Sequence, residues 1–112
     1  MSVEGVWTLE VYGPFGWDNR GVFVLDRGRI LGGDNRQYTV GDYQLANADF
    51  SANLNVHYYG PPRTDFGEAR EQFDTVIAGK LSEGVIEGSI GRRDRPQFDL
   101  QIRLTKRMEL PD

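Results

Sequence analysis

The sequence contains no cysteine and a single histidine, His57, among its 112 residues. The absence of cysteine excludes disulfides, thiolate metal sites and a cysteine nucleophile. With a single histidine, a transition-metal site would have to take its other ligands from carboxylates. A serine nucleophile would need His57 as its base, and no nucleophile-elbow motif surrounds any of the serines. We therefore predict no enzymatic activity, no metal and no cofactor, with His57 on the polar side of a strand.

The chain also lacks a long apolar run and an excess of basic residues. Its opening segment, Met1–Trp7, has neither a basic region nor an apolar stretch, so we expect no signal peptide and no membrane span. A net charge of −4 disfavours a nucleic-acid partner, because nucleic acid attracts basic surfaces. The basic cluster Arg92-Arg93-Asp94-Arg95 is interpreted as a solvated hairpin tip. Together these features predict a cytoplasmic protein with neither a nucleic-acid nor a membrane partner.

Glycine, in contrast, is abundant, and its 14 copies are spread along the chain between segments of alternating apolar residues. This combination is typical of many turns joining short strands. The length fits one domain, residues 1–112, with a radius of gyration of about 13 Å. The sequence therefore predicts a small all-β domain.

Eight segments have the composition of strands, and the connections between them are mostly short. Gly28 is expected to take a positive φ in the tight turn 26–29, and Gly41 to mark a bulge or bend. The double glycine Gly32-Gly33 would end one strand at a sharp corner. A meander of this kind closes into an eight-stranded antiparallel up-and-down barrel. The predicted strands are Val3–Tyr12, Gly21–Asp26, Arg29–Gly33, Tyr38–Leu45, Phe50–Tyr58, Phe73–Leu81, Val85–Ile90 and Gln97–Thr105, with loops at 13–19 and 60–67 and one helical turn at 68–72.

Strict alternation shows which side chains of two strands face inward. Phe50, Ala52, Leu54, Val56 and Tyr58 share one side of the fifth strand. The last strand alternates most clearly, with Phe98, Leu100, Ile102 and Leu104 on one side. The first two strands give no such signal, so their inward faces are assigned by assumption. The predicted barrel interior, or the lining of a small ligand site, is Trp7, Leu9, Phe23, Leu25, Leu54, Val56, Leu100 and Ile102.

Four aromatic residues occur where strand alternation does not explain them. Phe15 and Trp17 lie in the Gly/Pro-rich segment 13–19, where they would either plug one end of the barrel or form an exposed anchor for a dimer mate or another protein. Tyr58 and Tyr59 are adjacent, so one of them points outward if the strand continues through both. We predict all four, Phe15, Trp17, Tyr58 and Tyr59, as candidate protein-interface residues.

The N-terminal and C-terminal segments resemble those of lipocalin-like barrels. The motif Gly5-Val6-Trp7 is a G-x-W on the first strand, and Arg103, Lys106 and Arg107 follow near the end of the last. In those barrels the first-strand tryptophan closes the barrel base and a late basic residue stacks over it. The resemblance thus implies a cation over the indole of Trp7.

The first half of the chain more specifically resembles the GrlR family of negative regulators of type III secretion. The shared features are the Gly5/Trp7 opening, Gly21, the strand end Ile30-x-Gly32-Gly33-Asp34, and then Tyr38 and Gly41-x-Tyr43. The resemblance implies a small lipocalin-like β-barrel that forms a homodimer and has no enzymatic activity. The best-known member binds a transcriptional activator. An acidic run that this member carries on an exposed loop is missing here, because the corresponding segment 45–50 has only Asp49.

Two functions follow as hypotheses. The first is a non-enzymatic regulatory or adaptor protein that binds an unidentified protein partner, as a homodimer. The second is a lipocalin-like carrier that holds a small apolar ligand in the barrel. A carrier of drug-sized ligands needs a cavity of about 300 Å³ or more. A protein-binding module instead needs an exposed apolar patch, and its barrel can be packed solid.

Overall fold

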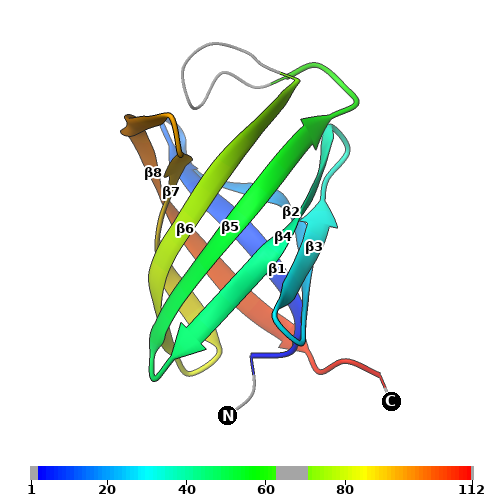
Figure 1. Ribbon diagram of the computed structural model, residues 1–112, viewed down its shortest axis with the longest axis vertical. Coiled ribbons are helices and arrows are strands. Elements are labelled where there is room, and N and C mark those ends of the chain that lie inside the picture. The colour runs from blue at the N-terminus through cyan, green and yellow to red at the C-terminus, as the bar shows by residue number, and fades with distance from the viewer. Residues whose placement is uncertain (1–2, 63–70, 112) are drawn as a thin grey trace.

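The chain folds into a closed, eight-stranded antiparallel β-barrel in which every strand pairs with its neighbours in sequence and β8 returns to pair with β1 (Figure 1). The computed structural model describes residues 3–62 and 71–111, and in residues 95–98 the backbone alone. No helix in this part of the chain is long and apolar enough to cross a membrane. The strands are β1 (Gly5–Gly13), β2 (Gly16–Asp26), β3 (Arg29–Gly33), β4 (Gln37–Ala46), β5 (Asp49–Tyr58), β6 (Gln72–Ser82), β7 (Val85–Arg92) and β8 (Arg95–Met108).

The predicted fold class is confirmed, but two of the predicted connections are wrong. The expected loop at 13–19 is only a two-residue turn, because Gly13 pairs with Gly16 and Tyr12 with Trp17. The β1–β2 pair instead continues to a bulge, where Arg20 and Gly21 of β2 lie opposite Leu9 of β1. The second wrong connection is the basic turn between the last two strands, expected at residues 91–96. Because β7 ends at Arg92 and β8 begins at Arg95, this turn has only two residues.

Two predicted turns have the expected geometry. At the β2–β3 hairpin Arg27 and Gly28 have φ values of 50° and 83°, as a tight type I′-like turn requires. At the end of β3, Gly33 has φ 155°, and a Cβ there would lie 2.2 Å from the carbonyl oxygen of Gln37. The double glycine thus lets the chain reverse closely into β4. The bulge expected at Gly41 is absent, since β4 pairs in continuous register with β3 and β5.

One further expectation, the helical turn at 68–72, falls mostly outside the described residues. Its last residue, Gln72, already belongs to β6. The loop predicted at 60–67 is described only as far as residue 62. Phe98, expected to face inward, belongs to the part of β8 whose side chains the structure does not describe.

The barrel interior is an apolar core, and both chain termini lie at the same end of the barrel (Figure 1). At this end Val3 and Trp7 are buried, and the indole N–H of Trp7 donates a hydrogen bond of 2.8 Å to the Val3 carbonyl. The radius of gyration, 13.2 Å, agrees with the length-based expectation. Of the predicted interior residues, Trp7, Leu9, Phe23, Leu25, Leu54, Val56 and Ile102 are buried, and Leu100 packs partly buried against them.

Candidate protein-binding surface and barrel interior

The outer surface of the barrel carries a continuous band of apolar side chains across β8 and β1 to β4. Cross-strand pairing joins Met108 to Val6, Val6 to Val24, Val24 to Leu31, and Leu31 to Val40. In the adjacent row Val22 and Tyr38 lie on either side of Gly33. Five members of the band are 40% to 55% exposed, which is unusual for large apolar side chains so close together. We call this surface the apolar belt: Val6, Val22, Val24, Leu31, Tyr38, Val40 and Met108.

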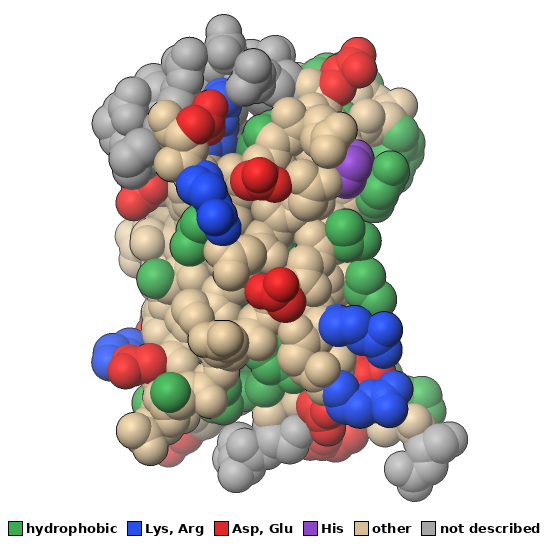
Figure 2. Space-filling model, viewed as in Figure 1, with side chains coloured by type: hydrophobic (Ala, Val, Ile, Leu, Met, Phe, Trp, Pro, Cys, Tyr) green, Lys and Arg blue, Asp and Glu red, His purple; other side chains and the backbone are tan. Residues whose placement is uncertain are grey.

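The outer face of β5 and β6 is polar instead. Asn55 donates a hydrogen bond of 2.7 Å to Asp74, and Asn53 donates one of 3.4 Å to Asp42. Figure 2 looks onto this face and shows few hydrophobic side chains over β5 and β6, whereas they gather along the edge beside the histidine. The two halves of the barrel therefore present opposite chemistry to their surroundings.

An aromatic stack extends the apolar belt onto β5. The rings of Tyr38 and His57 lie parallel, 4.8 Å apart at an angle of 4°, and the ring of Tyr59 stacks on Tyr38 at 6.5 Å. Tyr59 is exposed, while Tyr58 turns into the barrel and packs against Phe73. The predicted split of the tyrosine pair is confirmed, and of the two only Tyr59 is available as an interface residue. His57 lies on the outer side, as expected.

The β1–β2 hairpin does not plug the barrel. Trp17 pairs across the strands with exposed Tyr12, so both rings share the outer face, and they meet edge to face at 5.3 Å. Phe15 is fully exposed at the hairpin tip. Trp17 is half-buried because the guanidinium of Arg103 lies 4.2 Å from the centre of its ring, while Arg103 Nε donates to Glu10.

The resemblance implied a cation over Trp7, whereas the basic residue of β8 that lies over an indole is Arg103, and the indole is that of Trp17; Lys106 is the cross-strand partner of Trp7. Of the three basic residues near the end of β8, Arg103 covers Trp17 instead, Lys106 bonds to Glu109, and Arg107 Nε donates to the Thr8 hydroxyl. The alternation of β8 explains the difference. Ile102 and Leu104 fill the interior, so Arg103 points outward, where an inward-facing indole is out of reach.

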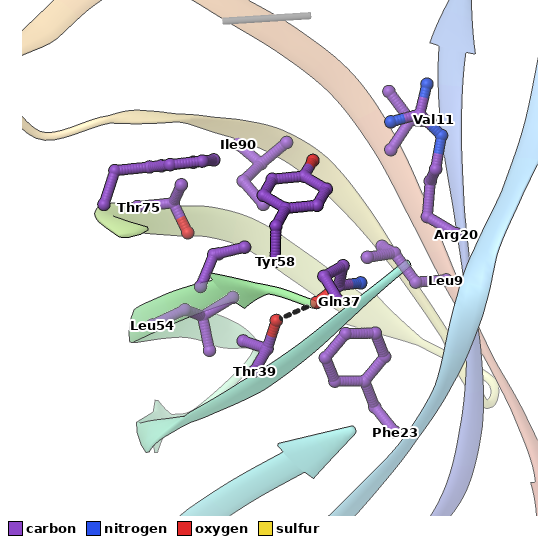
Figure 3. Close-up of a pocket in the computed structure, with 12 residues that line it drawn as sticks. Leu9, Val11, Arg20, Phe23, Gln37, Thr39, Leu54, Tyr58, Thr75 and Ile90 are labelled. Atoms are coloured by element: carbon purple, nitrogen blue, oxygen red, sulfur yellow. Dashed lines mark hydrogen bonds between the residues drawn. The ribbon is translucent and has the colours of Figure 1, made fainter. Parts of the chain in front are cut away.

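The interior holds a cavity of about 40 Å³ at the end away from the termini, here called the distal end (Figure 3). This volume is far below the roughly 300 Å³ that a drug-sized ligand needs. Figure 3 shows Tyr58, Gln37 and Arg20 gathered at the cavity, with Thr39 donating a hydrogen bond to Gln37. The lining is otherwise apolar and includes Leu9, Val11, Phe23, Leu54, Phe73 and Ile90.

Several polar residues are buried in this region, and the sequence pattern did not identify them. Gln37, Thr39 and Thr75 are buried, and so is Arg92, which was expected in a solvated hairpin tip. Arg92 turns inward because β7 continues as a strand through it, paired with Thr75 of β6. The alternation of β7 carried a signal: Ile86 and Ile90 face the interior, and Arg92, two residues after Ile90, falls on the same side if the strand continues.

Comparison with protein families and curated proteins does not assign a role to these surfaces. No family model matches the sequence, and no curated protein is significantly similar to it. The resemblance to the GrlR family therefore stays a prediction. Within residues 3–62 and 71–111, no three His, Asp or Glu side chains lie close enough together to hold a metal ion.

Proposed function

We propose that this protein is a non-enzymatic, cytoplasmic regulatory or adaptor protein of GrlR type that works as a homodimer and binds a further protein. The observation that carries the proposal is the apolar belt, together with an interior too small for a drug-sized ligand. Side chains on the outer face of a closed barrel do not contribute to its core. Their apolar character therefore needs a cause outside the folded monomer, and a protein interface supplies one.

The size of the belt fits a modest dimer interface. Strands lie about 4.8 Å apart and outward residues recur about every 6.8 Å along a strand, so the two rows of the belt on β1 to β4 present about 260 Å² of flat area, which the aromatic stack and the flanking polar rows enlarge. A standard interface buries about 800 Å² of accessible surface per partner, and corrugated accessible surface exceeds its flat projection. We expect a dissociation constant in the micromolar range.

The pairing of β2 with β3 makes this face complementary to itself. A twofold axis that runs parallel to the strands between β2 and β3 places each residue opposite its own cross-strand partner in the second copy. Val24 then meets Leu31 of the second copy, and exposed Val22 enters the hollow at Gly33. On the flanking row Asp26 meets Arg29 of the second copy. This one arrangement therefore pairs apolar side chains with each other, a protruding valine with a glycine, and an acidic residue with a basic one.

The further protein partner is expected at the β1–β2 hairpin. Phe15 is fully exposed there, and Trp17 lies on the outer face at the hairpin end of β2, beyond the bulge that separates it from the β2 residues of the apolar belt. Aromatic side chains of this kind dominate the binding energy of protein interfaces. The hairpin residues therefore keep the role that the sequence predicts for them.

Sedimentation equilibrium of the wild-type chain and one pair of matched variants tests the dimer. Leu31→Asp puts a charge at the centre of the apolar belt, and we expect it to be monomeric with an unchanged circular dichroism spectrum. Val76→Asp makes the same change at an exposed valine on β6, outside the belt, and we expect it to remain a dimer. A wild-type monomer at about 100 μM, well above the expected dissociation constant, or a dimeric Leu31→Asp variant, would contradict the proposal.

A further inference from the structure

Two buried polar groups at the distal end of the barrel have no hydrogen-bond partner within the described part of the chain. They are Nη1 of Arg92 and the hydroxyl of Thr75, and both residues are at least nine-tenths buried. The other guanidinium nitrogens of Arg92 donate to Asp94 at 3.0 Å and 2.7 Å. An unsatisfied buried donor costs about 1–3 kcal/mol, so a group that accepts hydrogen bonds there is favoured.

The two unsatisfied groups are placed together by the sheet. Thr75 and Arg92 are cross-strand partners on β6 and β7 and share the inner face, which brings their Cβ atoms to about 5 Å from each other. Thr75 lines the 40 Å³ cavity, as does Phe73, whose ring lies beneath the Arg92 guanidinium at 5.6 Å. The donors therefore lie beside the apolar wall of the cavity.

Two arginine side chains at this end of the barrel are much more buried than the aspartates that they bind. The side chain of Arg92 is 1% exposed while that of its partner Asp94 is 56% exposed. Arg20, which lines the cavity, repeats the arrangement, with 13% exposure against 64% for its partner Asp18. Water screens the outer carboxylates far more than the inner guanidiniums. Both guanidiniums are much less exposed than these two carboxylates.

We propose that the distal cavity binds a short-chain monocarboxylate. Its carboxylate oxygens accept hydrogen bonds from Nη1 of Arg92 and from the Thr75 hydroxyl, and its alkyl chain lies against Leu54, Val56 and Ile90. A cavity needs about 10–15 Å³ to hold one water molecule, so a cavity of 40 Å³ accommodates an alkyl chain of about three carbons. The apolar lining disfavours phosphate, which has no apolar part to bury. This site does not depend on the proposed dimer.

Titration of the ¹⁵N-labelled protein with butyrate, followed by NMR, tests the site. Butyramide has the same shape as butyrate without its charge, and octanoate has the same head group with a chain too long for the cavity. We expect saturable shifts at the Arg92 Nε–H and at the amides of Thr75 and Ile90, with millimolar affinity for butyrate. Butyramide should bind at least about tenfold more weakly, and octanoate no more tightly than butyrate.

Two variants locate the effect. Thr75→Val removes the hydroxyl at constant shape and should weaken butyrate binding by about tenfold. Thr105→Val makes the same change on the outer side of β8 and should leave the affinity unchanged. Equal binding of butyrate and butyramide, no saturable shift up to about 50 mM butyrate, or equal affinity of the two valine variants would each overturn the proposal. The butyrate–butyramide comparison uses the wild-type chain, so it decides the matter even if Thr75→Val fails to fold.

Discussion

The outer face of β1 to β4 and the outer face of β5 and β6 belong to the same sheet, yet the first carries the apolar belt and the second is mostly polar. The first carries Val22, Val24 and Leu31, while the second carries Asn53, Asn55 and Asp74. Both halves fill the same core with their inward residues, so folding does not account for the difference. Burial of the core explains one face of each strand, and only an interaction outside the monomer explains an apolar second face.

The largest expected effect comes from making the first face resemble the second. The triple variant Val22→Thr, Val24→Thr and Leu31→Thr places β-branched side chains on the outer face while removing the apolar surface at the centre of the belt. We expect the dimer dissociation constant to rise by about 100-fold or more, since each truncated apolar contact contributes about 1 kcal/mol. Sedimentation equilibrium measures the change, and thermal unfolding should show that the monomer still folds. A triple variant as dimeric as the wild type would remove the distinction between the two faces.

The next effect concerns the flanking charges. Arg29→Asp places like charges opposite each other in the proposed arrangement and should weaken the dimer by about tenfold. Reversing both charges, Asp26→Arg with Arg29→Asp, should restore most of the lost affinity, because the pair becomes complementary again. A double-mutant cycle measured by sedimentation quantifies this coupling. If the double variant is as weak as the sum of the two single changes, Asp26 does not face Arg29 of a second copy.

Trp17→Ala tests whether the β1–β2 hairpin contributes to the dimer interface that we place at the apolar belt. The substitution removes the contacts with Arg103 and Tyr12, and we expect it to destabilise the fold by about 1–2 kcal/mol, which lowers Tm by several degrees. Dimer affinity should stay within about twofold of the wild type. Calorimetry and sedimentation on the same sample check both statements. Loss of the dimer at unchanged Tm would place the self-interface at the hairpin.

The smallest effect is expected on the polar face. Asn55→Ala removes an exposed hydrogen bond to Asp74 and should change the free energy of unfolding by less than about 0.5 kcal/mol, with no effect on the dimer. Urea unfolding provides the measurement. A loss above about 1 kcal/mol would mean that the polar side-chain pairs of this face support the barrel more than their exposure indicates.

The sequence predicts the strand order well because β5 and β8 each have one apolar and one polar face. Phe50 to Tyr58 and the residues around Ile102 alternate so regularly that their inward members could be read directly. The segment Gly21–Asp26 has no such alternation, since both of its faces are apolar. In an antiparallel sheet a run of this kind marks an outer face with a partner, and it is the signal by which the apolar belt could have been found.

Features that depend on register between distant segments could not be predicted. The contact between Arg103 and Trp17 depends on the register of the β1–β2 hairpin, which is shifted by a bulge in β2 opposite Leu9 and does not follow from local composition. The alternation of β8, in contrast, already predicts that Arg103 points outward. Arg92 was assigned to a solvated turn because its neighbours are charged, whereas its pairing with Thr75 places it inside. Composition identifies turn-forming residues, but pairing across the sheet decides where the strand ends.

The most direct test of the central claim is an isotope-filtered NOE experiment on a mixture of labelled and unlabelled wild-type chains. It detects only contacts between different copies. The proposed dimer predicts intermolecular NOEs between the methyl groups of Val24 and those of Leu31 of the second copy. Intermolecular NOEs confined to the β1–β2 hairpin or to the face of β5 and β6, or none at concentrations where a dimer should dominate, would contradict it.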